Sequence, residues 1–293
     1  MVNYKSLIIV ILGGIKVKKV GEGVFKGTGL ILFLILIFIS VYPFVWMVLN
    51  SFRTNEELYL NTFALPRSWD FSIFPFVLGR GGMLIAAKNS AIITIIVVFL
   101  TVFACSLASF AFSHLRFRGS STLFKLYIGM QVVSGQVVLI SLFRVLHILN
   151  LFNSRIGVSL VMVAFGTPVT VYLFYNSFKS ISHEIRESTQ IDGCSNFRFY
   201  SQILMPLSRP VIATVVIFTT LGAWNEYLFA LTFLRSMELR TLTVRIAAFM
   251  GQFGSGFDTS FAVLSLSVIP VLLVFLFMQR HFIKGLTSGA IKG

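Results

Sequence analysis

The sequence predicts an all-α membrane protein with six transmembrane helices, and three observations support that class. Of the 293 residues, 56% are hydrophobic and 12% are charged, and the mean hydropathy is +0.89, a balance typical of membrane proteins. Six long stretches are almost free of Asp, Glu, Lys and Arg, and each approaches the ~20 residues that a spanning helix requires. Lysines are concentrated in the segments that would lie on one side of the membrane.

The six stretches fill most of the chain after a basic N-terminal tail. The third is the shortest, and the fifth is interrupted only by Glu226. Pro168 and Pro270 lie inside spans. A proline frees a backbone carbonyl there, so we expect both helices to be kinked and packed against neighbours. The spans are expected in residues 27–52, 89–113, 126–143, 156–178, 210–234 and 259–279.

An even number of spans puts both termini on one side of the membrane. If that side is the cytoplasm, Lys88 is the only lysine left outside, although the arginines are divided more evenly. The positive-inside rule therefore predicts that the N- and C-termini are both cytoplasmic. The same bias accounts for the net charge of +14 without any need for nucleic-acid binding.

This topology divides the chain into three parts. Residues 1–26 are expected to form a basic cytoplasmic tail and not a cleavable signal peptide, because the apolar run after them has the length of a true span. Residues 27–284 form the six-helix membrane domain. Residues 285–293 form a cytoplasmic C-terminal tail that is too glycine-rich to be a stable helix by itself.

Sequence motifs for catalysis or metal binding are absent. There is no Gly-Lys-[Ser/Thr] phosphate loop, so the chain is not expected to hydrolyse ATP by that route. His183 and Glu184 begin like a zinc-protease helix, but the second histidine is missing. The two cysteines, Cys105 and Cys194, are too few for a metal cluster or a disulfide framework. We therefore expect a protein that is not an enzyme and binds no metal.

The most polar run of the chain, residues 179–209, lies between the fourth and fifth spans and is called the polar loop here. Asp192-Gly193 is a turn dipeptide, and Gly193 is suited to the left-handed conformation that closes a helix. Ser195 is then placed to cap a second helix. The run predicts a helix–turn–helix, although an ordinary amphipathic loop explains these residues equally well. The second helix is expected to have an apolar face made by Phe197, Tyr200 and Leu204, and to end at Pro206 and Pro210.

The polar loop resembles the EAA signature of permeases in ABC importers. That signature has an acidic residue, two small residues, a glycine four positions later, and an apolar run that ends in proline. Glu187, Ser188, Thr189 and Gly193 match it, followed by residues 203–206. The fuller pattern is similar to the carbohydrate-uptake branch, in the subunit like the second permease of the maltose transporter. This chain departs from the pattern in having Ser188 and Thr189 for two alanines and His183 for a proline.

The resemblance implies that the loop contains a cytoplasmic coupling helix, which docks in a cleft of an ATPase subunit. The C-terminal tail also resembles that of the carbohydrate branch, where it inserts between two ATPase subunits. The residues implied in ATPase coupling are Glu187, Ser188, Thr189, Asp192 and Gly193, and those implied in the tail contact are Gly289, Ala290, Lys292 and Gly293.

The resemblance also implies an assembly in the plasma membrane of a bacterium or archaeon. Its members would be a homologous permease, two ABC ATPase subunits and an extracellular solute-binding protein. ATP and Mg²⁺ are then expected on the ATPase subunits, and no cofactor is expected on this chain.

Polar side chains inside the spans are the candidates for the substrate path. Glu226 is the only acid within a span, and a functional role is the default interpretation of such a residue; the alternative is a structural pair with Arg235. The neighbouring aromatic residues are equally typical of an interfacial belt. Amides in the third span should face the bundle, where hydrogen bonding between helices is the commoner explanation. The candidates are Glu226, Asn225, Trp224, Tyr227, Gln131 and Gln136.

These observations and the resemblance predict a permease subunit of an ATP-driven importer of a sugar or oligosaccharide. One alternative is an importer of another solute in the same superfamily. An alternative from another class is an ion-coupled secondary transporter, which usually shows internal repeats and several membrane-embedded acids. A membrane scaffold that transports nothing would leave the polar loop unexplained.

Overall fold

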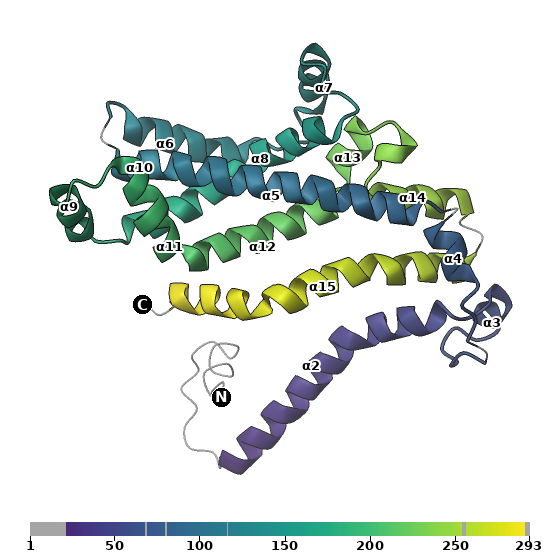
Figure 1. Cartoon of the computed structure of the whole chain (residues 1–293). Helices are drawn as coiled ribbons and strands as arrows, with labels where there is room; N and C mark the ends of the chain where they lie inside the picture. The colour runs from purple at the N-terminus through teal and green to yellow at the C-terminus, as the bar shows by residue number, and fades with distance from the viewer. Residues whose placement is uncertain (1–21, 68, 80, 116, 254–255, 291–293) are drawn as a thin grey trace. The chain divides into compact units, whose positions relative to one another are not determined.

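Every regular element in the described part of the chain is a helix (Figure 1). The computed structural model describes residues 22–67, 69–79, 81–115, 117–253 and 256–290. Two compact units are present and are described separately: residues 1–71 with 257–265, and residues 72–256 with 266–293. The all-α prediction is therefore confirmed for these residues. The predicted N-terminal tail lies outside them up to Gly21.

The first unit contains a long helix, α2 (Glu22–Asn50), and a short one, α3 (Asn55–Leu60). The side chains of α2 between Leu30 and Ile39 are exposed and apolar, as expected of a helix that faces lipid. Arg53 follows α2 and is only 3% exposed. Its guanidinium donates to the carbonyl oxygens of Glu57 and Asn61, at 2.6 Å each. A cation at these carbonyls also compensates the negative end of the α3 dipole.

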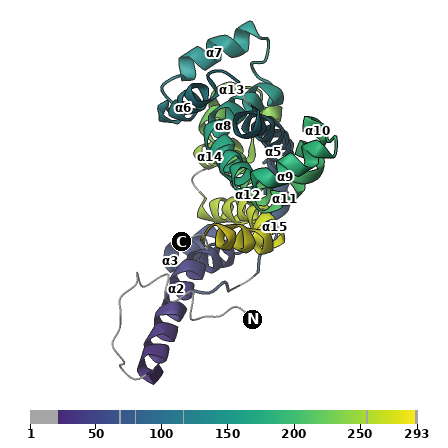
Figure 2. The ribbon, with the colours of Figure 1, turned by 90° about the vertical axis from the view of Figure 1, so that its left-hand side faces the viewer.

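The second unit is built around three long helices, α5 (Met83–His114), α8 (Arg155–Lys179) and α12 (Arg209–Asn225). Helix α5 contacts both others, and α12 also contacts α8. Figure 2 views the three helices nearly along their axes, as neighbours in one bundle. Small hydroxyl residues of α5 let the helices approach closely: Ser109, fully buried, donates to the carbonyl of Val171 on α8 at 2.9 Å.

Shorter helices surround this bundle. One apolar cluster, which includes Ile93, Val158 and Phe233, fills the half of the bundle near α13; another, which includes Phe174, Phe178 and Leu204, fills the half near the polar loop. The surrounding elements are α4 (Ile73–Leu78), α6 (Ser120–Gly129), η1 (Met130–Val132), α7 (Leu139–Ile148), α13 (Leu228–Phe233), η3 (Met237–Leu239) and α14 (Leu242–Phe253).

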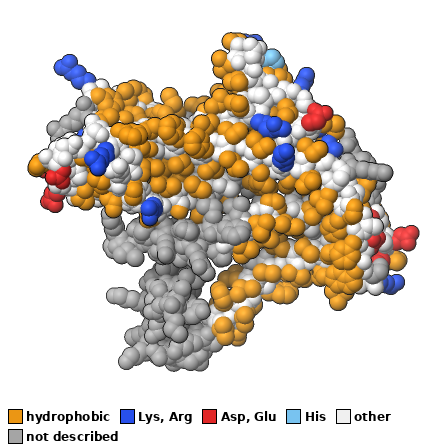
Figure 3. Space-filling model, in the orientation of Figure 1, with side chains coloured by type: hydrophobic (Ala, Val, Ile, Leu, Met, Phe, Trp, Pro, Cys, Tyr) orange, Lys and Arg blue, Asp and Glu red, His pale blue; other side chains and the backbone are white. Residues whose placement is uncertain are grey.

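Three helices in the described residues are long and apolar enough to cross a membrane, and a fourth crossing is counted if one strongly bent pair forms a single span. The three lie at Gly29–Asn50, Met83–His114 and Arg155–Lys179; the pair, Asn196–Leu207 with Arg209–Asn225, is bent by 77°. On the face shown in Figure 3, hydrophobic side chains form a broad band along the long helices of the second unit, and charged ones lie towards its two ends. Six spans and the side on which the termini lie stay predictions.

The third predicted span, residues 126–143, is not one helix. Helix α6 ends at Gly129, η1 ends at Val132, and α7 begins only at Leu139. At Gly135, between them, a β-carbon would lie 2.5 Å from the ring of Phe229. The chain therefore turns under an aromatic ring from α13, a tertiary contact that the length of an apolar run does not reveal.

The sixth predicted span lies within α15 (Phe257–Ala290), which contains Pro270. This helix also continues through residues 285–290, so these residues of the predicted tail are helical as an extension of the span and not as a helix of their own. Extending a helix that is already nucleated is far less costly than forming a new one, which explains why the glycines are tolerated. Gly289 and Ala290 are helical, whereas Lys292 and Gly293 lie outside the described residues.

Candidate functional site

The polar loop forms the predicted helix–turn–helix at one end of the second unit (Figure 1). Helix α9 (His183–Ile191) is followed by a turn and then by α10 (Asn196–Phe199). Gly193 has a φ of +74°, and the hydroxyl of Ser195 accepts a hydrogen bond from the backbone N–H of Arg198 at 3.3 Å. Both local predictions, the left-handed glycine and the serine cap, are confirmed.

The apolar face of the second helix differs from the prediction at one residue. A π-helical turn, η2 (Tyr200–Leu204), follows α10 and leads into α11 (Met205–Leu207). Phe199, Tyr200 and Leu204 are buried, but Phe197 is 73% exposed. Because a π turn closes hydrogen bonds over five residues, Phe199 and Leu204 share the buried face, and the 3.6-residue spacing that selected Phe197 does not apply.

Apolar and acidic side chains are exposed together on this loop. Ile191 is 86% exposed and Phe197 is 73% exposed, while the carboxylates of Glu184, Glu187 and Asp192 are also exposed. The hydroxyls of Ser188 and Thr189 donate to carbonyls three residues earlier in α9, at 3.1 Å and 2.8 Å. These two small residues are thus satisfied within their own helix, which leaves a surface of mixed apolar and acidic character.

Two side-chain hydrogen bonds join the polar loop to α5. Arg186 of α9 donates to the carbonyl oxygen of His114, the last residue of α5. The hydroxyls of Tyr200 and Ser106 lie 2.7 Å apart, and Ser106 is fully buried. The first bond is made at the end of α5 and the second within its length, so the loop is attached to that helix at two levels.

Glu226 lies at a break between helices and not inside one, which corrects the prediction of a continuous fifth span. Helix α12 ends at Asn225, and α13 begins at Leu228. The two carboxylate oxygens of Glu226 accept the backbone N–H groups of Phe229 and Ala230, at 2.9 Å and 3.0 Å. A carboxylate at a helix N-terminus satisfies donors that have no partner within the helix. Within the described residues, the Glu226 carboxylate makes this cap and does not form the alternative structural pair with Arg235.

The other substrate-path candidates do not meet at one place. Trp224 and Glu226 line different cavities, and the amide of Asn225 donates to the carbonyl of Leu221 in its own helix at 3.0 Å. Tyr227 is 41% exposed. Gln131 in η1 and Gln136 in the turn after it are both exposed. The prediction that these amides face the interior of the bundle is therefore wrong for this chain's own bundle.

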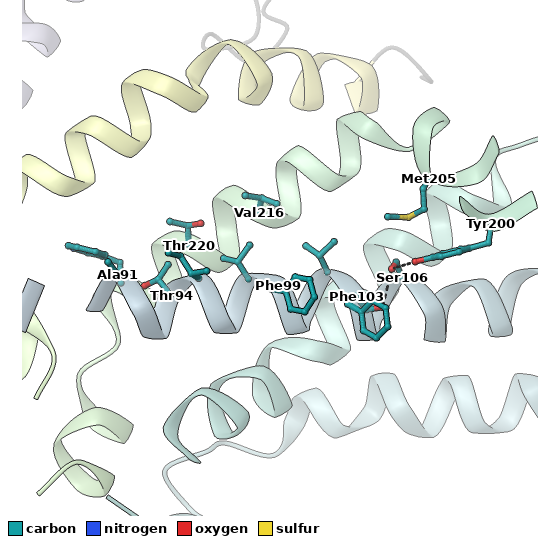
Figure 4. Close-up of a pocket in the computed structure, with 13 residues that line it drawn as sticks. Ala91, Thr94, Phe99, Phe103, Ser106, Tyr200, Met205, Val216 and Thr220 are labelled. Carbon is teal, nitrogen blue, oxygen red and sulfur yellow. Dashed lines mark hydrogen bonds between the residues drawn. The ribbon is translucent and has the colours of Figure 1, made fainter. Parts of the chain in front are cut away.

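A wide apolar groove of about 600 Å³ runs along α5 and α12 (Figure 4). Ser106 and Tyr200 lie at one end, joined by their hydrogen bond, and Ala91 lies towards the other. Phenylalanine and valine side chains make up much of its wall. Its apolar walls are unsuited to a polar solute. Within the described residues, no group of three or more His, Cys, Asp or Glu side chains is placed to hold a metal ion.

Sequence reasoning missed a polar network at the end of the bundle opposite the polar loop. The amide nitrogen of Asn89 donates to the carbonyls of Glu238 and Arg240 at 2.6 Å and 3.1 Å, and its oxygen accepts from Nε of Arg155 at 3.0 Å. The side-chain oxygen of Asn153 accepts the N–H groups of two residues that follow α13. The available signal was the presence of single asparagines at the edges of apolar runs.

Comparison with known structures shows which fold the chain has. A chain of a bacterial ABC transporter involved in the import of the acidic polysaccharide alginate matches with a TM-score of 0.79 and 22% identity, covering 91% of this chain and 100% of that one. At this identity the likeness shows that the two chains share a fold.

Sequence comparison then establishes the family. The sequence model of the protein family described as binding-protein-dependent transport system inner membrane component matches residues 7–288. A probable ABC transporter permease of Bacillus subtilis is 32% identical over 89% of this chain and 87% of its own length. The arabinooligosaccharide transport system permease of Halalkalibacterium halodurans is 29% identical over 89% of this chain and 94% of its own. The chain belongs to the family of binding-protein-dependent transport system inner membrane components, and it is a membrane transport subunit.

Proposed function

We propose that this protein is a permease subunit of an ATP-driven importer, and that its substrate is a sugar or oligosaccharide delivered by an extracellular binding protein. The observation that carries the proposal is the family match, which extends over residues 7–288. The saccharide is favoured because a relative aligned over nearly its whole length is named for arabinooligosaccharide transport. The fold shared with a chain of an alginate importer agrees with this class of substrate.

The proposed assembly contains this chain, a homologous permease, two ABC ATPase subunits and the binding protein. ATP and Mg²⁺ would be held by the ATPases, and the complex would lie in a bacterial plasma membrane with this chain crossing it several times. Closure of the ATPases around ATP would move α9, and the long helices would then alternate between two arrangements. In thermodynamic terms, such coupling requires two distinct sites that each shift the equilibrium of one element between its two conformations.

Helix α9 is the proposed contact with an ATPase subunit. The exposed Ile191 and Phe197 supply apolar area, and the exposed Glu187 and Asp192 supply charge. Large exposed apolar side chains are typical of the core of a protein interface, and the acidic side chains beside them would lie at its polar rim. Ser188 and Thr189 keep α9 narrow where it would enter a cleft, and Gly193 reverses the chain beyond it.

The C-terminal tail is the second proposed ATPase contact. Gly289 and Ala290 belong to α15, and the proposed contact also includes Lys292 and Gly293. Trp224, Asn225, Tyr227, Gln131 and Gln136 stay candidates for the substrate path, together with Glu226.

Co-purification and uptake test this function. The four membrane-associated subunits are expressed with a tag on this chain, and the ATPase recovered with it is quantified. Sugar-loaded binding protein should stimulate ATP hydrolysis by the reconstituted complex, and labelled saccharide should enter the vesicles. Glu187→Arg combined with Ile191→Ser should weaken the affinity for the ATPase by about thirtyfold and lower the recovered ATPase accordingly, since interface residues of this kind each contribute on the order of 1 kcal/mol.

Glu238→Arg is the matched control, because Glu238 is an exposed acid at the opposite end of the same unit. It should leave ATPase recovery unchanged. Full recovery of the ATPase with the α9 double variant would contradict the proposed dock. Failure of every saccharide to stimulate hydrolysis or enter the vesicles would contradict the proposed substrate class.

A further inference from the structure

The segment after α3 in the first unit, residues 61–71, exposes several large apolar side chains and is called the return loop here. Phe63 is 77% exposed and Leu65 is 72% exposed, and Trp69 and Phe71 are exposed as well. A single exposed apolar residue needs no explanation, but several large ones in one short loop mark an interaction surface.

The first part of the return loop folds back along α2. Nε1 of Trp46 donates to the carbonyl oxygen of Thr62 at 3.3 Å, and the ring centroids of Trp46 and Phe63 are 6.2 Å apart. Helix α2 ends at Asn50, so the level of Trp46 is ~6 Å before the helix end at 1.5 Å per residue. Phe63 therefore lies beside the last turns of α2 and not beyond them.

The second part of the return loop lies at the end of the same helix. The ring centroids of Trp69 and Phe71 are 5.1 Å and 5.0 Å from that of Phe52, which follows α2. The N–H of Asp70 donates to the carbonyl of Phe52 at 3.3 Å. The loop thus runs from the level of the last turns of α2 to just beyond the helix end.

The end of α2 is expected close to the surface of the hydrocarbon core. The apolar span Gly29–Asn50 has 22 residues, which rise ~33 Å, and the core of a bilayer is ~30 Å thick. Val45 and Val48, on either side of Trp46 in the sequence, are exposed and continue the apolar face of α2. At this depth Phe63 stands where acyl chains meet headgroups, and a soluble protein would have to enter the lipid to cover it.

The backbone around Phe63 is suited to a layer that is poor in water. The buried Arg53 donates to the carbonyl oxygens of Asn61 and Thr62, at 2.6 Å and 3.2 Å. The N–H groups of Phe63 and Ala64 donate to the side-chain oxygen and the carbonyl oxygen of Asn61. Near lipid, backbone polar groups need partners within the protein, and these four have them.

Polarity along the return loop follows the polarity of a membrane surface. Phe63 and Leu65, in the part that folds back, are apolar. The part at the helix end has Trp69 between two exposed side chains of opposite charge, Arg67 and Asp70. Tryptophan beside polar groups is typical of the headgroup layer, and the balanced charge requires no anionic lipid.

We propose that the return loop is an interfacial anchor in the membrane leaflet at the C-terminal end of α2. Phe63 and Leu65 lie where acyl chains meet headgroups, and Trp69 lies among the headgroups. Interfacial aromatic residues set the depth and tilt of a spanning helix, so the anchor fixes the position of α2 in the bilayer. The anchor requires that Gly29–Asn50 spans the membrane, and it is independent of the solute that is transported.

Photocrosslinking in the full complex identifies what covers Phe63. The photoreactive residue p-benzoylphenylalanine is placed at position 63 by amber suppression, and the complex is irradiated in nanodiscs of phosphatidylcholine. The intact mass of this chain should increase by that of one phosphatidylcholine. The matched control has the same photoreactive residue at position 197, because Phe197 is 73% exposed but lies in the polar loop. This control should give little or no lipid adduct.

Cysteine labelling measures the depth of the loop without a bulky probe. In a Cys194→Ser chain the remaining Cys105 is buried, so an added cysteine is the one that reacts. Leu65→Cys should react severalfold more slowly with a charged maleimide than Glu56→Cys, whose position on α3 is also exposed. Lipid excludes the charged reagent and disfavours the reactive thiolate. The two rates should become equal once the complex is denatured in detergent.

The outcomes decide between lipid, protein and water. A lipid adduct at position 63 and not at position 197, together with slow labelling of Leu65→Cys, supports the anchor. A crosslink from position 63 to another subunit or to the binding protein, in place of the lipid adduct, overturns it and makes the return loop a protein contact. Lipid adducts of equal yield at both positions, or equal labelling rates for Leu65→Cys and Glu56→Cys in the folded complex, also overturn it.

Discussion

The two ends of the second unit are built on different principles. At the end near α13, side chains fix the loops by hydrogen bonds to backbone: the buried Asn89 and Ser90 hold η3 and the segment after it, and the half-buried Asn153 holds the segment after α13. At the end that carries α9, the helix is exposed and joined to α5 through Arg186 and Tyr200. One end is held rigidly, and the other presents a surface to a partner.

This difference predicts that substitutions at the two ends should differ in whether they affect stability or coupling. Loops fixed through buried polar atoms lose stability when one partner is removed, because the other is left unsatisfied. An exposed helix has less to lose in stability, and its substitutions should act on coupling to another subunit. Stability and ATPase recovery, measured on the same variants, therefore test the comparison.

Asn89→Ala should have the largest effect on stability. Asn89 is 1% exposed and bridges Arg155 of α8 to the backbone of η3 and of the residue that follows it. Its removal leaves a charged donor and two carbonyls unsatisfied, at a cost of about 3 kcal/mol. Thermal unfolding of the purified complex in detergent should show a clearly lower Tm. Asn176→Ala is the control, since Asn176 is exposed on α8 and should change Tm little. Equal Tm values for both variants would contradict the rigid end.

Glu226→Ala should come second, because it removes both acceptors that cap α13. The N–H groups of Phe229 and Ala230 then lose their partners, which should cost about 1–2 kcal/mol. Glu226→Gln keeps one carbonyl oxygen for the cap but removes the charge and one acceptor. The Tm of this variant should be closer to that of the wild type, but its rate of saccharide import should be lower.

The two Glu226 variants distinguish a cap from a substrate contact. If uptake by Glu226→Gln equals wild type, and uptake by Glu226→Ala falls only in proportion to its lower Tm, Glu226 is a cap alone. Glu238→Gln serves as a control for removing an exposed acid at the same end, and should change neither Tm nor uptake.

Features fixed by neighbouring residues were predictable from the sequence. Asp192-Gly193 predicted the turn, and Gly193 has the expected positive φ. Ser195 predicted the cap that it forms. Each needs only the conformational preference of one residue and a donor three positions away. The family signature in the polar loop likewise needs only spacing along the chain, and the family assignment is confirmed.

Features fixed by tertiary contacts were not predictable. In the break of the third span, the ring of Phe229, far away in sequence, occupies the space that a side chain at position 135 would need. Phe197 is exposed because the π turn at Tyr200 changes which residues face the bundle.

Gly193→Ala should have a smaller effect, on the end that carries α9. A β-carbon at Gly193 meets no atom within 4 Å, so the cost comes only from the positive φ, about 1 kcal/mol for a residue other than glycine. Gly193→Asn should cost less, because asparagine tolerates this conformation. The expected result is a small change in Tm and a lower recovery of ATPase, with the alanine variant below the asparagine variant. A fall in Tm as large as that of Asn89→Ala would show that this end is also rigid.

The smallest effect is expected for the bond between Tyr200 and Ser106. Tyr200→Phe keeps the ring in the wall of the groove (Figure 4) and removes only the hydroxyl that lies 2.7 Å from Ser106. Ser106→Ala removes the other partner, and the double variant removes both. A double-mutant cycle should give a coupling energy of about 1 kcal/mol, the net contribution of one buried hydrogen bond.

The cycle also decides whether this bond transmits motion. Ser106 lies within α5, and Tyr200 opens the π turn that follows α10, so the bond links the exposed end to the rigid bundle. If the bond transmits displacement of α9, each single variant should hydrolyse more ATP per saccharide imported, although Tm changes little. Ser113→Ala is the control: it removes another α5 hydroxyl, which donates to the carbonyl of Ser109 in its own helix at 2.6 Å. An unchanged ratio of hydrolysis to import in Tyr200→Phe would leave Arg186 as the link between α9 and α5.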